Sequence, residues 1–182
     1  MRALIFAKPS TRLPGKHLID ICGEPMILRI HKILDGCRFF DSIIIYSKYE
    51  DIWVPGLETI RDRSTGTLLD SLISALELYD EFFAIGGDMP YVECKTISML
   101  ISNYTGKPVT VSDSHGFLQP LFAIYNRSIY RELKEHSTHD KRIYPFLSKN
   151  FSVITLGPED SETLLSINTE EDLNEARRRL RC

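Results

Sequence analysis

The sequence lacks any apolar run close to the roughly 20 residues that a helix needs to cross a lipid bilayer. It also lacks a long N-terminal apolar segment followed by a small-residue cleavage site. Neither sign of charge dominates, because the sequence has 22 lysines and arginines and 25 aspartates and glutamates. We therefore expect no membrane contact, no export and no nucleic-acid partner, since nucleic-acid binding usually needs a strong excess of basic residues.

Cysteine is scarce, and its four positions form no familiar pattern. Cys22, Cys37, Cys94 and Cys182 lie far apart, and no pair has the C-x-x-C spacing of a zinc or redox site. The five histidines show no metal-binding spacing either. From these absences we expect neither a zinc site nor a disulfide framework, and we expect the reducing cytoplasm as the compartment.

Nothing in the sequence marks an internal boundary. No proline- or serine-rich linker, low-complexity tract or fixed-period repeat divides the chain. The 182 residues are 43% apolar, which is enough material for one hydrophobic core. We therefore expect a single domain over residues 1–182.

Short apolar runs predict strands that are buried on both faces, because their apolar residues are nearly continuous and do not alternate. Helical patterns lie between them, as where Leu69, Leu72, Ile73 and Leu76 repeat at three and four residues. This alternation predicts an α/β fold, a Rossmann-like three-layer αβα sandwich with a mostly parallel sheet. Ligands bind such sheets beyond the carboxyl ends of the strands. The expected strands are residues 3–7, 43–46, 82–85, 109–111 and 121–125.

The segment after the first expected strand, residues 7–16, is suited to phosphate. Its two prolines and one glycine disfavour regular structure. From the residues alone it is equally well a solvated surface loop, because it matches neither a Walker A sequence nor G-x-G-x-x-G. Hydroxyl groups and positive charges that can contact phosphate oxygens come from Ser10, Thr11, Arg12 and Lys16.

Asp88 follows the expected strand at residues 82–85, with two glycines before it and Pro90 after it. A carboxylate in this place lies at the carboxyl edge of the sheet, on a backbone that can approach a ligand closely. Mg²⁺ prefers carboxylate, water and phosphate oxygens, so one acid beside a triphosphate is enough to anchor it. The alternative is a turn aspartate that accepts from nearby amides.

Three further positions precede expected helices. Asp62 offers a carboxylate that can accept from the two adjacent donors of guanine, a pair that cytosine does not have, and the alternative is an Asx turn. Gly66 either lets backbone amides approach a substrate or relieves crowding. Asn168 precedes Thr169 and Asp172, which predict a capping box, and its own role is either a turn or a ligand contact.

Four segments, taken in order, resemble the molybdenum cofactor guanylyltransferases of the nucleotidyltransferase superfamily. The wording of the first, STRLPGK followed by GEPMI, is also similar to the cytidylyltransferases that activate sugar acids. Those cytidylyltransferases have a metal-binding aspartate at the position of Asn168, where the guanylyltransferases have asparagine. The resemblance implies a nucleotide-diphospho-sugar transferase type of fold. The segments are residues 7–27, 82–90, 119–125 and 166–173.

The resemblance also assigns roles. It implies that Asp88 binds Mg²⁺, that Lys16 and Arg12 act with it in catalysis by offsetting phosphate charge, and that Asn168 contacts the acceptor. Asp62 is the candidate for base recognition. The nucleotide contacts implied by the resemblance are Ala7, Ser10, Lys16, Asp62, Gly66 and Asp88.

The implied reaction is transfer of GMP from GTP to molybdopterin with release of pyrophosphate. The expected partners are these two small molecules and, transiently, molybdenum cofactor biosynthesis or acceptor proteins. Other open hypotheses are cytidylyl transfer to a sugar acid or molybdopterin, guanylyl transfer to adenosylcobinamide phosphate, and a nucleotide-binding partner protein without catalysis. The last arises because Lys8 and Pro9 stand where the guanylyltransferases usually have two glycines. Ser47 stands where they often have an asparagine that helps to hold the base, so the preference for guanine is only implied by the resemblance.

Overall fold

The computed structural model describes residues 1–49, 52 and 54–182. Within them a seven-stranded sheet has the order β5-β4-β1-β6-β8-β7-β9. The strands β5, β4, β1 and β6 are mutually parallel, β8 is antiparallel to both β6 and β7, and β9 is parallel to β7. All five expected strands are confirmed. The strands are β1 (Arg2–Ala7), β4 (Ser42–Ser47), β5 (Glu58–Arg61), β6 (Glu81–Gly86), β7 (Val109–Ser112), β8 (Leu118–Asn126) and β9 (Ser152–Thr155).

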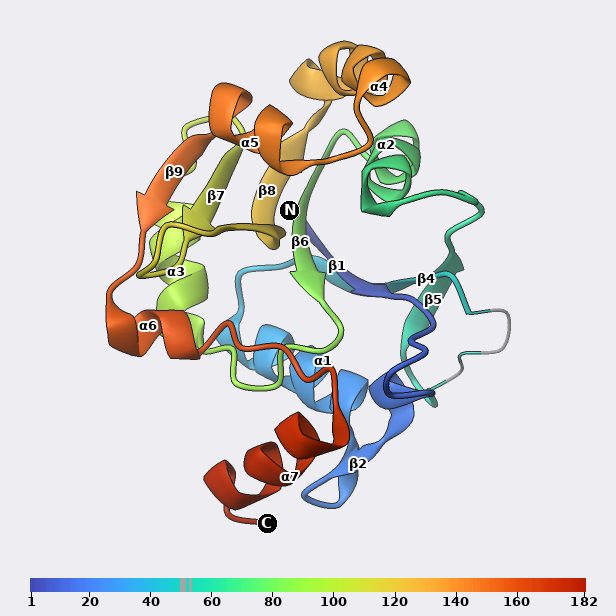
Figure 1. Ribbon diagram of the computed structural model, residues 1–182, viewed down its shortest axis with the longest axis vertical. Helices are drawn as coiled ribbons and strands as arrows, with labels where there is room; N and C mark the ends of the chain where they lie inside the picture. Colours follow the sequence, from blue (N-terminus) through green and yellow to red (C-terminus); the bar gives the residue numbers. More distant parts are fainter. Residues whose placement is uncertain (50–51, 53) are drawn as a thin grey trace.

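Helices cover the sheet on both faces, which confirms the three-layer αβα prediction. Successive residues of β1 pack on opposite sides: Ile5 belongs to one core cluster, whereas Leu4 and Phe6 belong to the other. Figure 1 shows α2, α4 and α5 above the strands, and α1 and α7 below them. The first cluster includes residues of α1 (Met26–Cys37), α3 (Cys94–Ser102) and α7 (Glu170–Arg179), and the second those of α2 (Leu68–Leu78), α4 (Tyr130–His139) and α5 (Tyr144–Asn150).

Shorter elements complete the fold. The segment after β1 leads through the 3-10 helix η1 (Lys16–Leu18) into a small hairpin of β2 (Asp20–Ile21) and β3 (Glu24–Pro25). Another 3-10 helix, η2 (Arg127–Ile129), joins β8 to α4, and α6 (Pro158–Glu162) follows β9 on the way to α7. None of the helices in the described part of the chain is long and apolar enough to span a bilayer.

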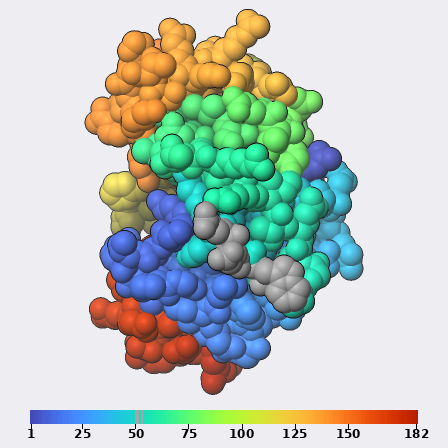
Figure 2. All heavy atoms as spheres, turned by 90° about the vertical axis from the view of Figure 1, so that its right-hand side faces the viewer, coloured from blue at the N-terminus to red at the C-terminus, as the bar shows by residue number. Residues whose placement is uncertain are grey.

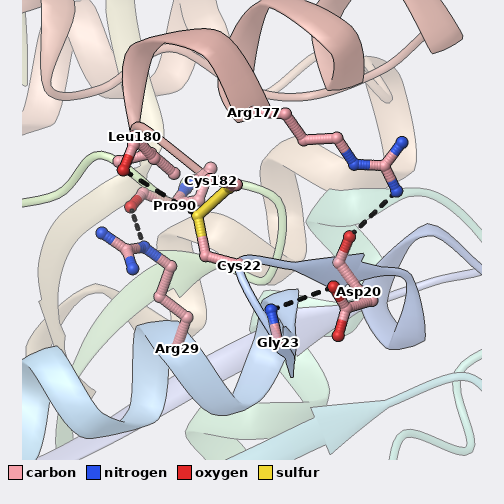
Figure 3. Close-up of a disulfide and its surroundings, with 8 residues drawn as sticks. All are labelled: Asp20, Cys22, Gly23, Arg29, Pro90, Arg177, Leu180 and Cys182. Atoms are coloured by element: carbon pink, nitrogen blue, oxygen red, sulfur yellow. Dashed lines mark hydrogen bonds between the residues drawn. A yellow bond between two sulfur atoms is a disulfide. The ribbon is translucent and has the colours of Figure 1, made fainter.

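Two disulfides pair all four cysteines, so the prediction of no disulfide framework is wrong. Cys37, the last residue of α1, is bonded to Cys94, the first residue of α3. Cys22, in the turn between β2 and β3, is bonded to Cys182 beyond the end of α7 (Figure 3). The partners are 57 and 160 residues apart in sequence, and only the tertiary fold brings them together. Sequence spacing therefore gave no signal for them.

Side-chain contacts reinforce the junction at Cys22. Arg177 of α7 donates from Nη2 to the carbonyl oxygen of Asp20 at 3.1 Å, and the Asp20 carboxylate accepts from the amide of Gly23 at 3.0 Å (Figure 3). The end of α7 is thus held to the β2–β3 hairpin by a covalent bond and by the hydrogen bond from Arg177.

Candidate active site

Polar side chains gather at the carboxyl edge of the three neighbouring parallel strands β4, β1 and β6. Lys8 directly follows β1, Lys48 directly follows β4, and Asp88 lies two residues beyond β6. Figure 2 shows the blue N-terminal segment between the green residues of α2 above and the red C-terminal helix below. A pocket opens here, lined by Phe6, Ala7, Lys8, Lys16, His17, Tyr46, Lys48, Asp62, Gly66, Thr67, Leu68, Ser71, Asp88 and Leu121.

Lys16 and Asp88 meet across this pocket. The Lys16 ammonium donates to Asp88 Oδ2 at 2.5 Å, to Asn168 Oδ1 at 3.0 Å and to the carbonyl oxygen of Ile167 at 3.2 Å. The Lys16 side chain is only 6% exposed, so its charge depends on these oxygens for stabilisation. The structure therefore brings together the basic segment and the acid after β6, and it adds the start of α7 to the same cluster.

Close backbone packing holds Asp88 in place. The amide of Ile167 donates to the carbonyl oxygen of Asp88 at 2.8 Å, and the amide of Gly87 donates to that of Phe6 at 2.9 Å. A Cβ atom at Gly87 would lie 2.8 Å from the His17 ring and 3.1 Å from the Phe6 carbonyl oxygen. Glycine therefore suits the position before Asp88, because a side chain there would force the His17 ring to shift and would crowd the backbone of β1.

The start of α7 positions Asn168. The amide of Asp172 donates to Thr169 Oγ1 at 3.1 Å, and Asp172 Oδ2 accepts from the amides of Thr169 and Asn168. These contacts confirm the predicted capping box. The Asn168 amide is also the largest cause of the lowered pKa of the Asp172 carboxyl. Since the backbone of Asn168 is fixed in this way, its side-chain oxygen stays on Lys16.

The Asp88 carboxylate is the kind of donor that Mg²⁺ accepts. Asp88 Oδ2, Asn168 Oδ1 and the Ile167 carbonyl oxygen already accept from the Lys16 ammonium, so an ion here would use Asp88 Oδ1. No group of three or more acidic, histidine or cysteine side chains with metal-site geometry occurs in the described ranges. An ion at Asp88 would therefore draw its remaining ligands from water and substrate phosphates, as Mg²⁺ commonly does. The residues present fit this group.

The other predicted residues of the first segment lie apart from this cluster. Arg12 is exposed and has no hydrogen bond or ion pair among the described residues, although its charge helps to lower the pKa of Asp172. Ser10 accepts from the amide of Leu13 at 3.2 Å, which makes it part of a local turn. Ala7 lines the pocket, and its carbonyl oxygen accepts from the amide of Lys48.

Asp62 and Gly66 both line the pocket, and both also have local structural roles. Asp62 Oδ1 accepts from the amide of Ser64 at 2.9 Å, which is the Asx turn that the sequence left open. Its Oδ2 lies 3.7 Å from the Lys48 ammonium, and the side chain is 2% exposed. A Cβ atom at Gly66 would lie 2.0 Å from Asp70 Oδ2, so this glycine also relieves crowding.

His17 and Lys48 are pocket residues to which sequence analysis gave no role. Burial is the largest cause that lowers the pKa of His17, to about 4, against an opposing effect of the Asp88 charge. Its Nδ1 lies 3.1 Å from the Tyr49 hydroxyl, and the ring is neutral at neutral pH. Lys48 could have been found, because it directly follows a predicted parallel strand. His17 is next to Lys16 in the sequence, which places it near a ligand, but the fold of η1 determines the direction of its side chain.

Comparisons with known proteins identify the family of this chain. The MobA-like NTP transferase domain family matches residues 7–153. A protein of Natranaerobius thermophilus named "Probable molybdenum cofactor guanylyltransferase" is 27% identical over 98% of this chain and 95% of its own length. A 3-deoxy-manno-octulosonate cytidylyltransferase of Francisella philomiragia is 31% identical, but over 56% of this chain and 44% of its own length.

A solved structure has the same fold. The crystal structure of molybdopterin-guanine dinucleotide biosynthesis protein A from Archaeoglobus fulgidus superimposes with a TM-score of 0.73, 18% sequence identity and 98% coverage of each chain. This likeness confirms the α/β fold of the nucleotide-diphospho-sugar transferase type. Since the family match covers most of the sequence, the chain belongs to the MobA-like NTP transferase domain family and is a nucleotidyltransferase.

Proposed function

We propose that this nucleotidyltransferase transfers GMP from GTP to the terminal phosphate of molybdopterin and releases pyrophosphate. The observation that carries the proposal is the contact of Lys16 with Asp88 and Asn168 at the carboxyl edge of the sheet. The similarity to a guanylyltransferase over 98% of the chain supports guanosine as the nucleoside. The asparagine at position 168 supports the same branch of the superfamily.

The chemistry needs no protein nucleophile, because the acceptor phosphate is already anionic. The protein has to hold two negatively charged reactants in line and offset their repulsion. Lys16 supplies a buried positive charge, and Asn168 with the Ile167 carbonyl fixes its direction. When bound at Asp88, Mg²⁺ would add Lewis-acid stabilisation of the phosphate oxygens. Arg12 would attract the anionic reactants from the open side of the site.

His17 helps to keep the reacting end of the site dry. The ring is buried against Gly87 and Tyr49 and carries no charge at neutral pH. A neutral ring adds no positive charge that would compete with Lys16 for Asp88. Low water content strengthens the interactions of Lys16 and Asp88 with phosphate oxygens.

Cytidylyl transfer is the second candidate, and one observation favours it. Both carboxylate oxygens of Asp62 face groups of the chain itself, Ser64 and Lys48, which weakens the case for Asp62 as a reader of guanine. Competition between GTP and CTP for the pocket distinguishes the two candidates.

We also propose that the protein acts in the cytoplasm, because nucleoside triphosphates are found there. The two disulfides would then have to resist reduction by the cytoplasmic thiol pool.

The direct test is pyrophosphate release with each of the four nucleoside triphosphates and Mg²⁺. Molybdopterin, a sugar acid and a corrinoid phosphate are supplied in turn as acceptors. We expect release with GTP and molybdopterin, and with neither alone. Release with CTP and a sugar acid would move the chain to the cytidylyl branch. GTP binding without release under any condition would identify a non-catalytic nucleotide-binding protein.

Asp88→Asn tests the role of the carboxylate. We expect kcat to fall about a hundredfold or more, because a lost electrostatic contact of this kind costs about 3 kcal/mol in the transition state. Asp80→Asn is the matched control, since Asp80 is an exposed aspartate that pairs with Arg127 outside the pocket. Circular dichroism checks that both variants fold. Unchanged turnover in Asp88→Asn would reject the metal assignment.

A further inference from the structure

The loop between β5 and α2 forms one wall of the pocket. Asp62, Gly66 and Thr67 line the cavity, yet residues 62–67 contain no helix or strand. At its ends the loop is held by the amide of Asp62, which donates to the carbonyl oxygen of Ser47 at 2.7 Å, and by the contacts of Thr67 with Asp70 and Ser71. Between these ends it has the turn between Asp62 and Ser64 and a 3.3 Å contact between the hydroxyls of Ser64 and Ser71. The shape of residues 63–66 therefore depends on contacts from outside the loop.

Lys48 supplies those contacts. Its ammonium donates to the carbonyl oxygen of Ser64 at 2.9 Å, to Ser64 Oγ at 3.0 Å and to the carbonyl oxygen of Gly66 at 3.0 Å. The Asp62 carboxylate lies 3.7 Å away. The three acceptors match the three N–H groups of an ammonium. At the other end of the residue, the Lys48 amide donates to Ala7, which fixes its backbone to β1.

A lysine beside a nucleotide pocket would ordinarily be assigned to phosphate, and the geometry argues against this for Lys48. All three of its donors already serve the loop, so a phosphate contact would require those hydrogen bonds to break. Lys16 is the cation that lies with Asp88 and Asn168. The positive charge of Lys48 also offsets the negative charge of Asp62, whose side chain is buried.

We propose that Lys48 is a positioning residue that clamps residues 62–66 and so sets the shape of the nucleotide pocket. The proposal that this pocket accepts a nucleotide rests on the proposed function, whereas the clamp itself does not. Without the ammonium, the middle of the loop loses its anchor to the end of β4, and Asp62 loses its counter-charge, while the Asp62 amide still holds the start of the loop to Ser47. The pocket wall then opens to solvent, and every ligand that packs against it binds more weakly.

Limited trypsin digestion tests the clamp without any ligand. Arg63 lies exposed within the loop, and its cleavage requires the loop to open. We expect Lys48→Met to raise the cleavage rate after Arg63 about tenfold or more, as followed by peptide mass. Lys32→Met is the matched control, because Lys32 is 62% exposed and pairs with Glu24 away from the pocket. Equal cleavage of Lys48→Met and wild type would overturn the clamp.

Ser64→Ala is a milder variant that keeps the test decisive if Lys48→Met fails to fold. It removes one of the three acceptors of Lys48, together with the contact to the Ser71 hydroxyl, and leaves Asp62 paired. We expect cleavage after Arg63 at a rate between those of wild type and a fully released loop. Ser10→Ala, which removes the hydroxyl of a different turn, is its control. No difference between the two serine variants would contradict the proposal.

Binding measurements separate the clamp from a phosphate contact. Calorimetry compares GTP with guanosine, which has no phosphate. A clamp predicts that Lys48→Met weakens both by a similar factor, because both pack against the same wall. Loss confined to GTP would overturn the clamp in favour of a phosphate contact. If wild type binds neither ligand, the proposed function fails, while the digestion result still decides the clamp.

Discussion

The two faces of the sheet are built from similar layers but are held differently. On one face, α1 is cross-linked to α3, and the end of α7 is cross-linked to the β2–β3 hairpin. On the other face, α2, α4 and α5 pack without covalent links, because all four cysteines are used on the first face. The first face therefore depends on the oxidation state of the protein, whereas the second depends on non-covalent contacts alone.

The candidate site draws on both faces. The start of α7 holds Asn168 against Lys16, at the end of the pocket where Asp88 lies. The loop before α2 forms the opposite wall and is fixed by Lys48. We therefore expect destabilisation of the first face to affect the end of the site at Asp88 first, and destabilisation of the second face to affect the opposite wall first. This difference can be tested by perturbing each face separately.

Removal of the Cys22–Cys182 disulfide should have the largest effect. In the chain-entropy account, closing a loop between residues 160 apart stabilises the fold by about 5 kcal/mol. We expect the double variant Cys22→Ser, Cys182→Ser to lose up to this amount in urea unfolding. Amide hydrogen exchange should rise in α7 before α2. Equal loss of protection in both helices would remove the distinction between the faces.

Acid should destabilise the site through His17. The pKa of His17 is lowered from 6.5 to about 4, so its stabilising effect is complete above pH 6.5 and is lost as the pH falls towards 4. Over that window the unfolded chain binds the extra proton, which corresponds to about 3 kcal/mol in total. Between pH 7 and pH 4, we expect the free energy of unfolding to fall less in His17→Gln than in wild type. An equal fall in the two proteins would show that His17 is not the group responsible.

The two helix caps offer the smallest and most closely matched comparison. Thr67 donates from its amide and hydroxyl to Asp70 at the start of α2, and Thr169 forms the corresponding box with Asp172 at the start of α7. Each Thr→Ala variant should lose about 1 kcal/mol in thermal or urea unfolding. Thr169→Ala should lower kcat, because Asn168 positions Lys16. Thr67→Ala should act on KM, because it alters the pocket wall.

Much of the fold could be predicted because most of its strands correspond to apolar runs in the sequence. Residues 82–85 and 122–125 are buried, and both lie in strands. The direction of β8 could not be predicted, since a buried strand has the same pattern whether it is parallel or antiparallel to its neighbours. Helix α4 gave no signal either, because Leu133 is its only buried apolar residue.

The site was predictable where the topology dictates it. Lys16 and Asp88 follow parallel strands whose carboxyl ends lie together, so their meeting follows from the sheet. The isolation of Arg12 could not be predicted, because it depends on how the segment turns around Ser10. The ion pair between Lys48 and Asp62 could not be predicted either, since it joins the end of a strand to a loop 14 residues further along the chain.

The bond between Cys22 and Cys182 also determines what the protein becomes when it denatures. It closes most of the polypeptide into a covalent ring, with the Cys37–Cys94 ring nested inside. An oxidised chain that unfolds cannot swell to the dimensions of a free coil, and it exposes less new surface to solvent. Its unfolding free energy should therefore vary less steeply with urea concentration than that of the reduced chain.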